Sequence, residues 1–304
     1  MRLRRSIKWL LGLIAVIVLA SAGGWLYITM PHMEEGAPPP LPDYEFVPDE
    51  AVEKGQPFHV LLLGVDRRGN EPGRSDTMML MRVEPDGTIR LISFMRDLYV
   101  PIPGRSEPDR LNHAFAYGGP DLVRKAIKEN FGVDAQYYAV VDFHGFQRVI
   151  DVLGGVEVDV DHAMPPTGDL PGLSPGLQRL NGEQALRYVR FRQDAEGDFG
   201  RVRRQQQLIQ AVAQEVKSVY GILQTPRLIK AAYPYVRTNL GLDELLRLAK
   251  AADWKPDATH NLRIPVDGSY TQQRIRGMAV LVPDLEANRK AIEAFLGESV
   301  WAKH

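Results

Sequence analysis

The chain has 304 residues, of which 44% are hydrophobic and 25% are charged, values that fit one large globular domain or two smaller ones. Its net charge of -1 and its pI near 6.7 argue against non-specific nucleic-acid binding, which usually needs a strongly basic domain. It has no cysteine, which excludes disulfides, a lipoprotein cysteine and cysteine-based zinc sites.

The N-terminus combines positive charge with a long apolar run. Residues 1–8 are basic, and the run from Trp9 to Met30 is as long as the roughly 20 residues that a helix needs to span a bilayer. Because positive flanks stay in the cytoplasm, we expect a single-pass cell-membrane protein with a cytoplasmic N-terminus and an extracellular remainder. The alternative is a signal peptide cleaved near Ala20-Ser21-Ala22, which also exports the remainder.

Proline-rich residues 31–56 are predicted to form a linker and residues 57–304 the folded domain, with no clean second domain boundary. Apolar runs and alternation predict strands at 58–64, 78–83, 89–94, 137–141, 156–160, 262–266 and 278–282. Helical spacing and capping residues predict helices at 121–130, 143–153, 183–188, 198–219, 242–252 and 285–295. Strands that alternate with helices predict a three-layer α/β fold.

The densest positive charge lies between Arg187 and Gln207, in the segment RYVRFRQDAEGDFGRVRRQQQ. Arginine concentrated in a nearly neutral chain indicates a local anionic target, and its planar fork suits phosphate. If Arg190-Phe191-Arg192 is extended, its two arginines point to one face while Phe191 turns into the core.

The helix predicted to begin at Asp198 adds two more polar groups. Arg201 and Gln205 stand at positions i and i+4 and therefore share one face near the helix start, where exposed amides also favour an anion. Asp198 either caps this helix or orients a neighbouring arginine. The remaining arginines of the segment are not expected on the same face; they are Arg187, Arg203 and Arg204.

A second polar segment follows the first predicted strand. Asp66 lies just past the end of that strand, and Arg74-Ser75-Asp76-Thr77 leads into the next. Loops at strand ends are where α/β proteins place their sites, and two carboxylates together with phosphate oxygens suit Mg²⁺. Asp66 and Asp76 fit ordinary turns equally well. Arg96 follows another apolar strand and is expected to reach the same rim, beside Asp97.

Other polar residues carry weaker signals. His113 and His144 lack metal-ligand spacing, so structural roles are expected for both. The chain has neither the GxSxG turn of a serine hydrolase nor the GxxxxGK[ST] loop of an NTP-binding protein.

A set of segments in fixed order resembles the LytR-CpsA-Psr family, over roughly residues 57–215. The segments are LLLGVDRR, GRSDTMMLMRV, ISFMRDLYVPIPG, LNHAFAYGG, VVDFHGFQRVIDVLGGVEVDV and LNGEQALRYVRFRQDAEGDFGRVRRQQQ. The resemblance implies an α/β/α sandwich with a mostly mixed central sheet behind an N-terminal transmembrane helix. It also implies an apolar tunnel for a prenyl chain, for which Ile209, Val212 and Val216 are candidates, although ordinary core packing is the better explanation for any one of them.

The resemblance implies an enzyme that moves a glycopolymer from a polyprenyl-pyrophosphate carrier to peptidoglycan and leaves a phosphodiester link. Its partners are the lipid-linked glycan, peptidoglycan and membrane lipid, without nucleic acid. The glycopolymer is a teichoic acid, a capsule or a similar polymer. The alternatives are a pyrophosphatase acting on the same carrier and a non-enzymatic cell-envelope regulator of the kind labelled transcriptional attenuators.

The resemblance also implies roles for individual residues. Asp66 and Asp76 hold Mg²⁺, or Mn²⁺ in its place, and Asp66 is the less secure ligand because the loop after it varies in length. The pyrophosphate contacts are Arg74, Arg96, Arg190, Arg192, Arg201 and Gln205. The residues expected to take part in catalysis are Arg96, Asp76 and Asp198, the last by orienting an arginine. Three candidates remain open for activation of the acceptor hydroxyl: Asp76, Asp97 or the metal.

Overall fold

The computed structural model describes residues 41–49, 52–53, 55–67, 73–86, 88–168, 170–216, 235–241, 244 and 260–297. The predicted membrane span at Trp9–Met30 lies outside these residues, as does the predicted helix at 242–252 apart from Glu244. Within the part of the chain that the structure describes, no helix is long and apolar enough to cross a membrane.

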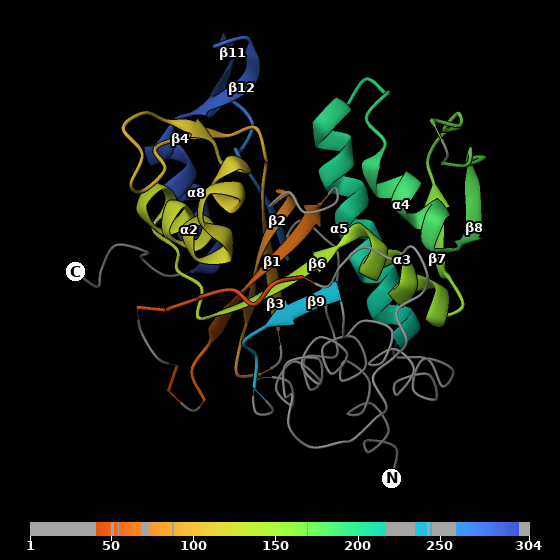
Figure 1. The fold of residues 1–304 in the computed structure, drawn as a ribbon, viewed down its shortest axis with the longest axis horizontal. Coiled ribbons are helices and arrows are strands. Elements are labelled where there is room, and N and C mark those ends of the chain that lie inside the picture. The colour runs from red at the N-terminus through yellow and green to blue at the C-terminus, as the bar shows by residue number, and fades with distance from the viewer. Residues whose placement is uncertain are drawn as a thin grey trace. The chain divides into compact units, whose positions relative to one another are not determined.

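The chain divides into two compact units (Figure 1), which are described separately. The sheet unit takes the described residues within 43–85, 89–140 and 257–304, and the helical unit takes those within 41–42, 86–88 and 141–256. The single folded domain over residues 57–304 stays a prediction. Each unit is assembled from segments that are far apart along the chain, so no single linker marks the division.

The sheet unit is built on a mixed sheet in which β10, β3, β2, β1 and β6 lie side by side in this order. Its strands are β1 (Phe58–Asp66), β2 (Arg74–Val83), β3 (Ile89–Phe94), β6 (Tyr137–Asp142) and β10 (Asn261–Ile264). β1 pairs antiparallel with β2 and β2 with β3, whereas β10 runs parallel to β3. Val60, Leu61 and Leu63 of β1 are all buried, which explains why this apolar run forms an interior strand.

Two helices of the sheet unit, α2 (His113–Phe131) and α8 (Leu285–Leu296), pack on this sheet and on each other. They supply one helical layer of the predicted sandwich. α2 begins eight residues before the predicted start at Asp121, because a kink at Gly118 and Gly119 joins an extra N-terminal segment to the predicted helix. It ends at Gly132, whose φ of 80° belongs to the left-handed region that glycine adopts without strain.

Three short strand pairs complete the sheet unit and the helical unit. The sheet unit carries β4 (Tyr99–Val100) paired with β5 (Asp109–Arg110), and β11 (Tyr270–Ile275) paired with β12 (Met278–Pro283). The helical unit carries β7 (Val156–Val160) paired with β8 (Gly176–Leu180), and it also contains β9 (Val236–Thr238). Among these strands only β7 and β12 were predicted, since the others are short or polar.

Residues 43–49 do not behave as the predicted linker. The ring of Tyr44 lies 5.6 Å from that of Phe115, and Phe46 lies 4.8 Å from Tyr138. Asp49 forms an ion pair of 3.1 Å with Arg124. The folded part of the chain therefore begins before Phe58, because aromatic and acidic residues of this proline-rich segment have partners on the sheet unit.

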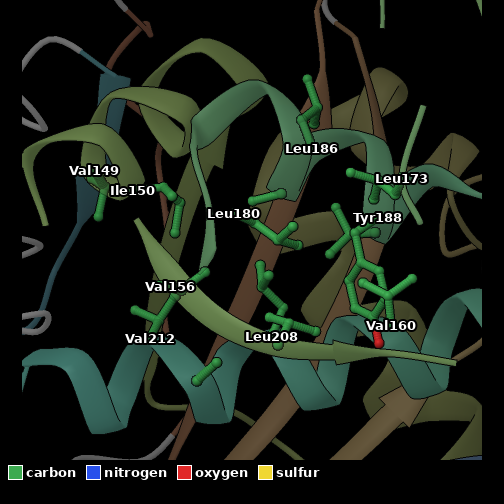
Figure 2. Close-up of a cluster of buried hydrophobic side chains, with 14 of the residues drawn as sticks. Val149, Ile150, Val156, Val160, Leu173, Leu180, Leu186, Tyr188, Leu208 and Val212 are labelled. Atoms are coloured by element: carbon green, nitrogen blue, oxygen red, sulfur yellow. The ribbon is translucent and has the colours of Figure 1, made fainter. Parts of the chain in front are cut away.

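The helical unit has its own hydrophobic core, made where α3 (Phe143–Val152), α4 (Gly182–Arg190), α5 (Gly197–Val216) and β7 meet. Figure 2 shows Val156 and Val160 of β7 in one cluster with Leu208 and Val212 of α5. Val212, a candidate for the tunnel, is thus an ordinary core residue, while Ile209 is half-buried.

Candidate functional site

The site residues predicted from the sequence fall in both units. Four lie in the sheet unit: Asp66, Arg74, Asp76 and Arg96. Five lie in the helical unit: Arg190, Arg192, Asp198, Arg201 and Gln205. Within each unit, the structure shows which of these side chains contact one another.

A β-bulge displays Asp76 at the end of β2. In the register of the two strands, Gly64 lies opposite Thr77 and Val65 lies opposite Ser75. Asp76 is therefore the extra residue of the bulge and lies opposite no residue of β1. A bulge re-aims side chains and is common beside functional sites. Gly64 belongs to this arrangement, because a Cβ at that position would come within 3.0 Å of the Thr77 side chain.

Asp66 is the last residue of β1 rather than the first residue beyond it, and Arg74 is its register partner on β2. The strand continues two residues past the predicted end because Val65 is buried and keeps the ladder going. Asp66 and Arg74 therefore face each other across the pair of strands that also carries the bulge.

Arg96 follows β3 and reaches the bulge. Its Nη1 donates a hydrogen bond of 2.9 Å to Asp76 Oδ1, and its Nε lies 3.5 Å from Asp97 Oδ2. The exposed fractions of the Arg96, Asp76 and Asp97 side chains are 16%, 21% and 20%. Guanidinium and carboxylates are thus held together at the surface of the unit, as the sequence predicted for this rim.

In the helical unit, Asp198 stands between two of the predicted arginines. Arg201 Nη2 donates a hydrogen bond of 2.9 Å to Asp198 Oδ2, and Arg192 Nη1 lies 4.0 Å from Asp198 Oδ1. α5 begins at Gly197, so Asp198 lies in the first turn and is not the cap that one interpretation expected. The other interpretation, that it orients a neighbouring arginine, agrees with these contacts.

The predicted extended geometry of Arg190-Phe191-Arg192 is wrong at Arg190. Arg190 is the last residue of α4, because the helix continues two residues beyond the predicted end, and its guanidinium lies 4.8 Å from the centre of the Phe143 ring. Phe191 is extended and buried, as predicted. Arg192 is about half exposed, whereas Arg201 and Gln205 are buried in α5.

The three arginines that were not expected on the same face have structural partners. Arg204 is fully buried, donates 3.1 Å to the Phe191 carbonyl and pairs with Asp194. Arg187 donates to the Pro165 carbonyl. Arg203 donates to Glu196 and Asp161; burial alone would raise the pKa of Asp161, but this hydrogen bond lowers it below its usual value.

A group of residues that the sequence analysis did not connect lies beside Arg96. Arg110 donates 3.2 Å to Asp97 Oδ1 and its other nitrogen lies 3.1 Å from His113 Nε2. His113 Nδ1 lies 3.0 Å from Asp109 Oδ2. The Asp109–His113 spacing of i, i+4 across a helix start was the available signal; His113 was judged by metal-ligand spacing alone.

The carboxylates that the sequence predicts as metal ligands are Asp66 and Asp76. Among the residues that the structure describes, no group of three or more His, Cys, Asp or Glu side chains is placed to hold a metal ion. The donor set of Asp66 and Asp76 fits a hard cation only if phosphate oxygens and water supply the remaining ligands, which is the way that Mg²⁺ is usually bound.

Comparison with known proteins covers most of the chain. The regulatory protein MsrR of Staphylococcus aureus is 35% identical over 253 residues, which cover 81% of this chain and 76% of that protein. The polyisoprenyl-teichoic acid–peptidoglycan teichoic acid transferase TagU of Bacillus cereus is 31% identical, over 87% of this chain and 89% of that protein.

A solved structure of YwtF (TagT), a LytR-CPS2A-psr family protein with bound octaprenyl pyrophosphate lipid, is also similar. It matches with a TM-score of 0.60 and 25% sequence identity, over 82% of this chain and 94% of that one. The LytR_cpsA_psr family itself matches residues 41–293, which extends the likeness beyond the segments quoted above and includes Tyr44 and Phe46. The chain belongs to the LytR_cpsA_psr family.

Proposed function

We propose that this chain is a transferase that moves a glycopolymer from a polyprenyl-pyrophosphate carrier to peptidoglycan and forms a phosphodiester link. The name of TagU supports the reaction class, and the lipid bound to TagT supports the carrier. The observation on this chain that carries the proposal is the Arg96–Asp76 pair of 2.9 Å on the β2 bulge. It sets a fork-shaped cation, suited to phosphate, beside a carboxylate suited to a hard cation.

The reaction is a phosphoryl transfer. The oxygen of an acceptor sugar hydroxyl attacks the phosphorus that carries the glycan, the bridging P–O bond of the pyrophosphate breaks, and polyprenyl phosphate leaves. The hydroxyl proton passes to a carboxylate, for which Asp76 and Asp97 are the candidates. Negative charge builds on the leaving phosphate, so cationic side chains that contact it lower the barrier. The residues proposed to contact the pyrophosphate are Arg74, Arg96, Arg190, Arg192, Arg201 and Gln205.

Asp66 and Asp76 are proposed to hold Mg²⁺, which Mn²⁺ can replace, with substrate oxygens and water as further ligands. When bound, the ion neutralises phosphate charge. Asp198 is proposed to orient Arg201 and Arg192. The anchor at residues 9–30 is proposed to keep the enzyme at the membrane surface, where the lipid carrier presents its head group.

One assay tests this function against its alternatives. The full chain in detergent is incubated with a labelled polyprenyl-pyrophosphate glycan, Mg²⁺ and peptidoglycan oligomers. Label that moves to peptidoglycan supports the transferase. Release of glycan phosphate without transfer indicates the pyrophosphatase, and neither product indicates a regulator, the role that the name MsrR carries.

Replacing Asp76 with asparagine is expected to raise the Mg²⁺ concentration needed for half-maximal transfer by about tenfold or more, because a charged oxygen ligand is lost. The transfer rate is measured across a Mg²⁺ titration. Asp267→Asn is the matched control, because the Asp267 side chain is 89% exposed and forms an ion pair with Arg263. An unchanged Mg²⁺ dependence of Asp76→Asn contradicts the metal assignment.

Replacing Asp198 with asparagine is expected to lower kcat/KM for transfer by about tenfold, because Arg201 loses a charge-assisted hydrogen bond. Asp194→Asn provides the contrast within the same unit, since Asp194 pairs with the fully buried Arg204. It is expected to lower the unfolding temperature instead. The orienting role of Asp198 is refuted if Asp198→Asn loses stability and keeps its kcat/KM.

A further inference from the structure

Asp76 and Arg96 begin a continuous chain of polar contacts within the sheet unit. Asp97 lies 3.5 Å from Arg96 Nε and accepts a hydrogen bond of 3.2 Å from Arg110. Arg110 in turn contacts His113 at 3.1 Å, and His113 contacts Asp109 at 3.0 Å. Carboxylates and guanidinium groups alternate along this chain as far as Arg110, and His113 then links Arg110 to Asp109, so the placement of each group depends on the next.

The backbone fixes this chain to the segment that carries Arg96. Leu111 N–H donates 2.8 Å to the Leu98 carbonyl, and Asn112 N–H donates 3.2 Å to the Arg96 carbonyl. The β4–β5 pair lies beside these bonds and sets Tyr99 opposite Arg110. The segment from Asp109 to His113 is therefore held against Arg96 by main-chain hydrogen bonds, which fix the positions of the backbone atoms that carry its side chains.

The contacts of His113 determine which of its nitrogens carries the proton. A guanidinium can only donate, so Arg110 leaves His113 Nε2 as the acceptor. His113 Nδ1 then donates to Asp109, which also accepts a hydrogen bond of 2.7 Å from Tyr117. Both contacts are satisfied together only by the neutral imidazole with its proton on Nδ1.

We propose that His113, supported by Asp109, is a positioning residue for phosphoryl transfer: its neutral Nε2 holds Arg110, which holds Asp97 against Arg96. This inference rests on the proposed function. His113 touches no reacting group and acts through Arg110. A proton on Nε2 removes the acceptor and adds a cation beside the guanidinium. Arg110 then loses its contact with His113, Asp97 is held less firmly by Arg110, and Arg96 loses part of the support that Asp97 gives it.

The groups around His113 favour this arrangement. Arg110 and Asp109 contact His113 directly. Tyr117 contacts Asp109, and the guanidinium of Arg105 lies 4.3 Å from the centre of the Tyr117 ring. Arg74 also contributes positive charge at Tyr117. Burial alone would raise the pKa of Asp109, but hydrogen bonds from Tyr117 and His113 lower it, so Asp109 stays charged and His113 Nδ1 keeps its acceptor.

The experiment compares His113→Ala and His113→Gln with the unchanged full chain. Consumption of lipid-linked glycan pyrophosphate and label transfer to peptidoglycan are measured separately, at about pH 7.5 and about pH 5.5. Glutamine cannot titrate, but its oxygen can accept the hydrogen bond from Arg110. His144→Gln is the control, because His144 belongs to the helical unit, where its ring packs edge-on against Tyr235.

We expect His113→Ala to lower kcat by about tenfold at the higher pH, with a smaller change in KM, because Arg96 contributes mainly in the transition state. His113→Gln is expected to recover most of the lost rate at the higher pH. At the lower pH, the unchanged chain and His144→Gln are both expected to be slower, whereas His113→Gln is expected to keep its rate. A rate in His113→Ala equal to that of the unchanged chain overturns the inference, and so does a fall in His113→Gln as steep as that of the unchanged chain.

The two proposals fail in different ways. If the unchanged chain consumes the lipid donor and transfers nothing to peptidoglycan, the proposed transferase is wrong, and the consumption rates of the variants still decide the role of His113. If the unchanged chain does not consume the donor at either pH, both proposals are overturned. Normal transfer by the unchanged chain together with unaffected His113 variants overturns only the positioning role.

Discussion

Replacing Arg96 with alanine is expected to lower kcat/KM for glycopolymer transfer by about 10²- to 10³-fold, the usual effect of removing one donor that stabilises transition-state charge. Arg96 bridges Asp76 at 2.9 Å and Asp97 at 3.5 Å, so its loss removes both the proposed phosphate contact and the group that holds two carboxylates apart. The measurement is label transfer from the lipid-linked donor to peptidoglycan under single-turnover conditions.

Two variants make this result specific. Arg96→Lys keeps the charge and loses the planar fork, so its rate is expected to fall between those of the unchanged chain and Arg96→Ala. Arg263→Ala removes an arginine of the same unit that pairs with the exposed Asp267, and it is expected to transfer normally. If Arg96→Ala transfers as fast as Arg263→Ala, Arg96 does not contact the pyrophosphate.

Replacing Arg124 with methionine is expected to lower the free energy of unfolding by about 3–5 kcal/mol, the range found when one partner of a buried ion pair is removed. The Arg124 side chain is only 1% exposed and contacts Asp49, Asp121 and Asp134 at 3.1, 3.0 and 2.7 Å. Methionine fills much of the volume but leaves these carboxylates without their shared cation. The measurement is denaturant unfolding followed by circular dichroism.

The destabilisation caused by Arg124→Met should shrink in acid. For Asp121, burial raises the pKa, but hydrogen bonds from Lys125 and Arg124 outweigh it and lower the pKa. For Asp49, a hydrogen bond from Lys128 is the largest cause of a lowered pKa. A lowered folded-state pKa gives stability that is present above the unfolded-state pKa and is lost as the pH falls through the folded-state value. The unchanged chain therefore loses this stability in acid, whereas the variant has already lost the part that Arg124 contributes.

Arg263→Met is the control for this prediction, because its exposed ion pair is expected to contribute less than about 1 kcal/mol. If Arg124→Met unfolds at the same denaturant concentration as Arg263→Met, the three carboxylates do not depend on Arg124. A gap between the two variants that stays constant from neutral pH to about pH 3 contradicts the assignment to carboxylate pairs.

Local patterns predicted most of the long elements. The strand at 156–160 and the strand at 89–94 have the predicted limits, and the helix at 143–153 differs by one residue. These segments follow hydrophobic periodicity or capping rules, such as the Asp142 side chain that accepts from Gly145 N–H. Short strands were missed, because β4 and β5 form only where tertiary contacts bring Tyr99 and Arg110 together.

The same division applies to the candidate site. The sequence separated the arginines of the 187–207 segment by helical geometry, and the structure gives Arg187, Arg203 and Arg204 partners within the protein. It did not predict the connection from Arg96 through Arg110 to His113, because residues 96 and 113 meet through a loop whose path depends on main-chain bonds to Leu98 and Arg96.

The sequence by itself determined the family, the main strands and helices, and the two clusters of arginine and carboxylate residues, since these depend on residue type and on spacing along the chain. Only the tertiary structure decided the division into two units, the bulge that displays Asp76, and the tautomer of His113. The physical reason is that these features come from contacts between residues distant in sequence. A ladder register or a hydrogen bond of that kind leaves no periodic pattern that a single chain can reveal.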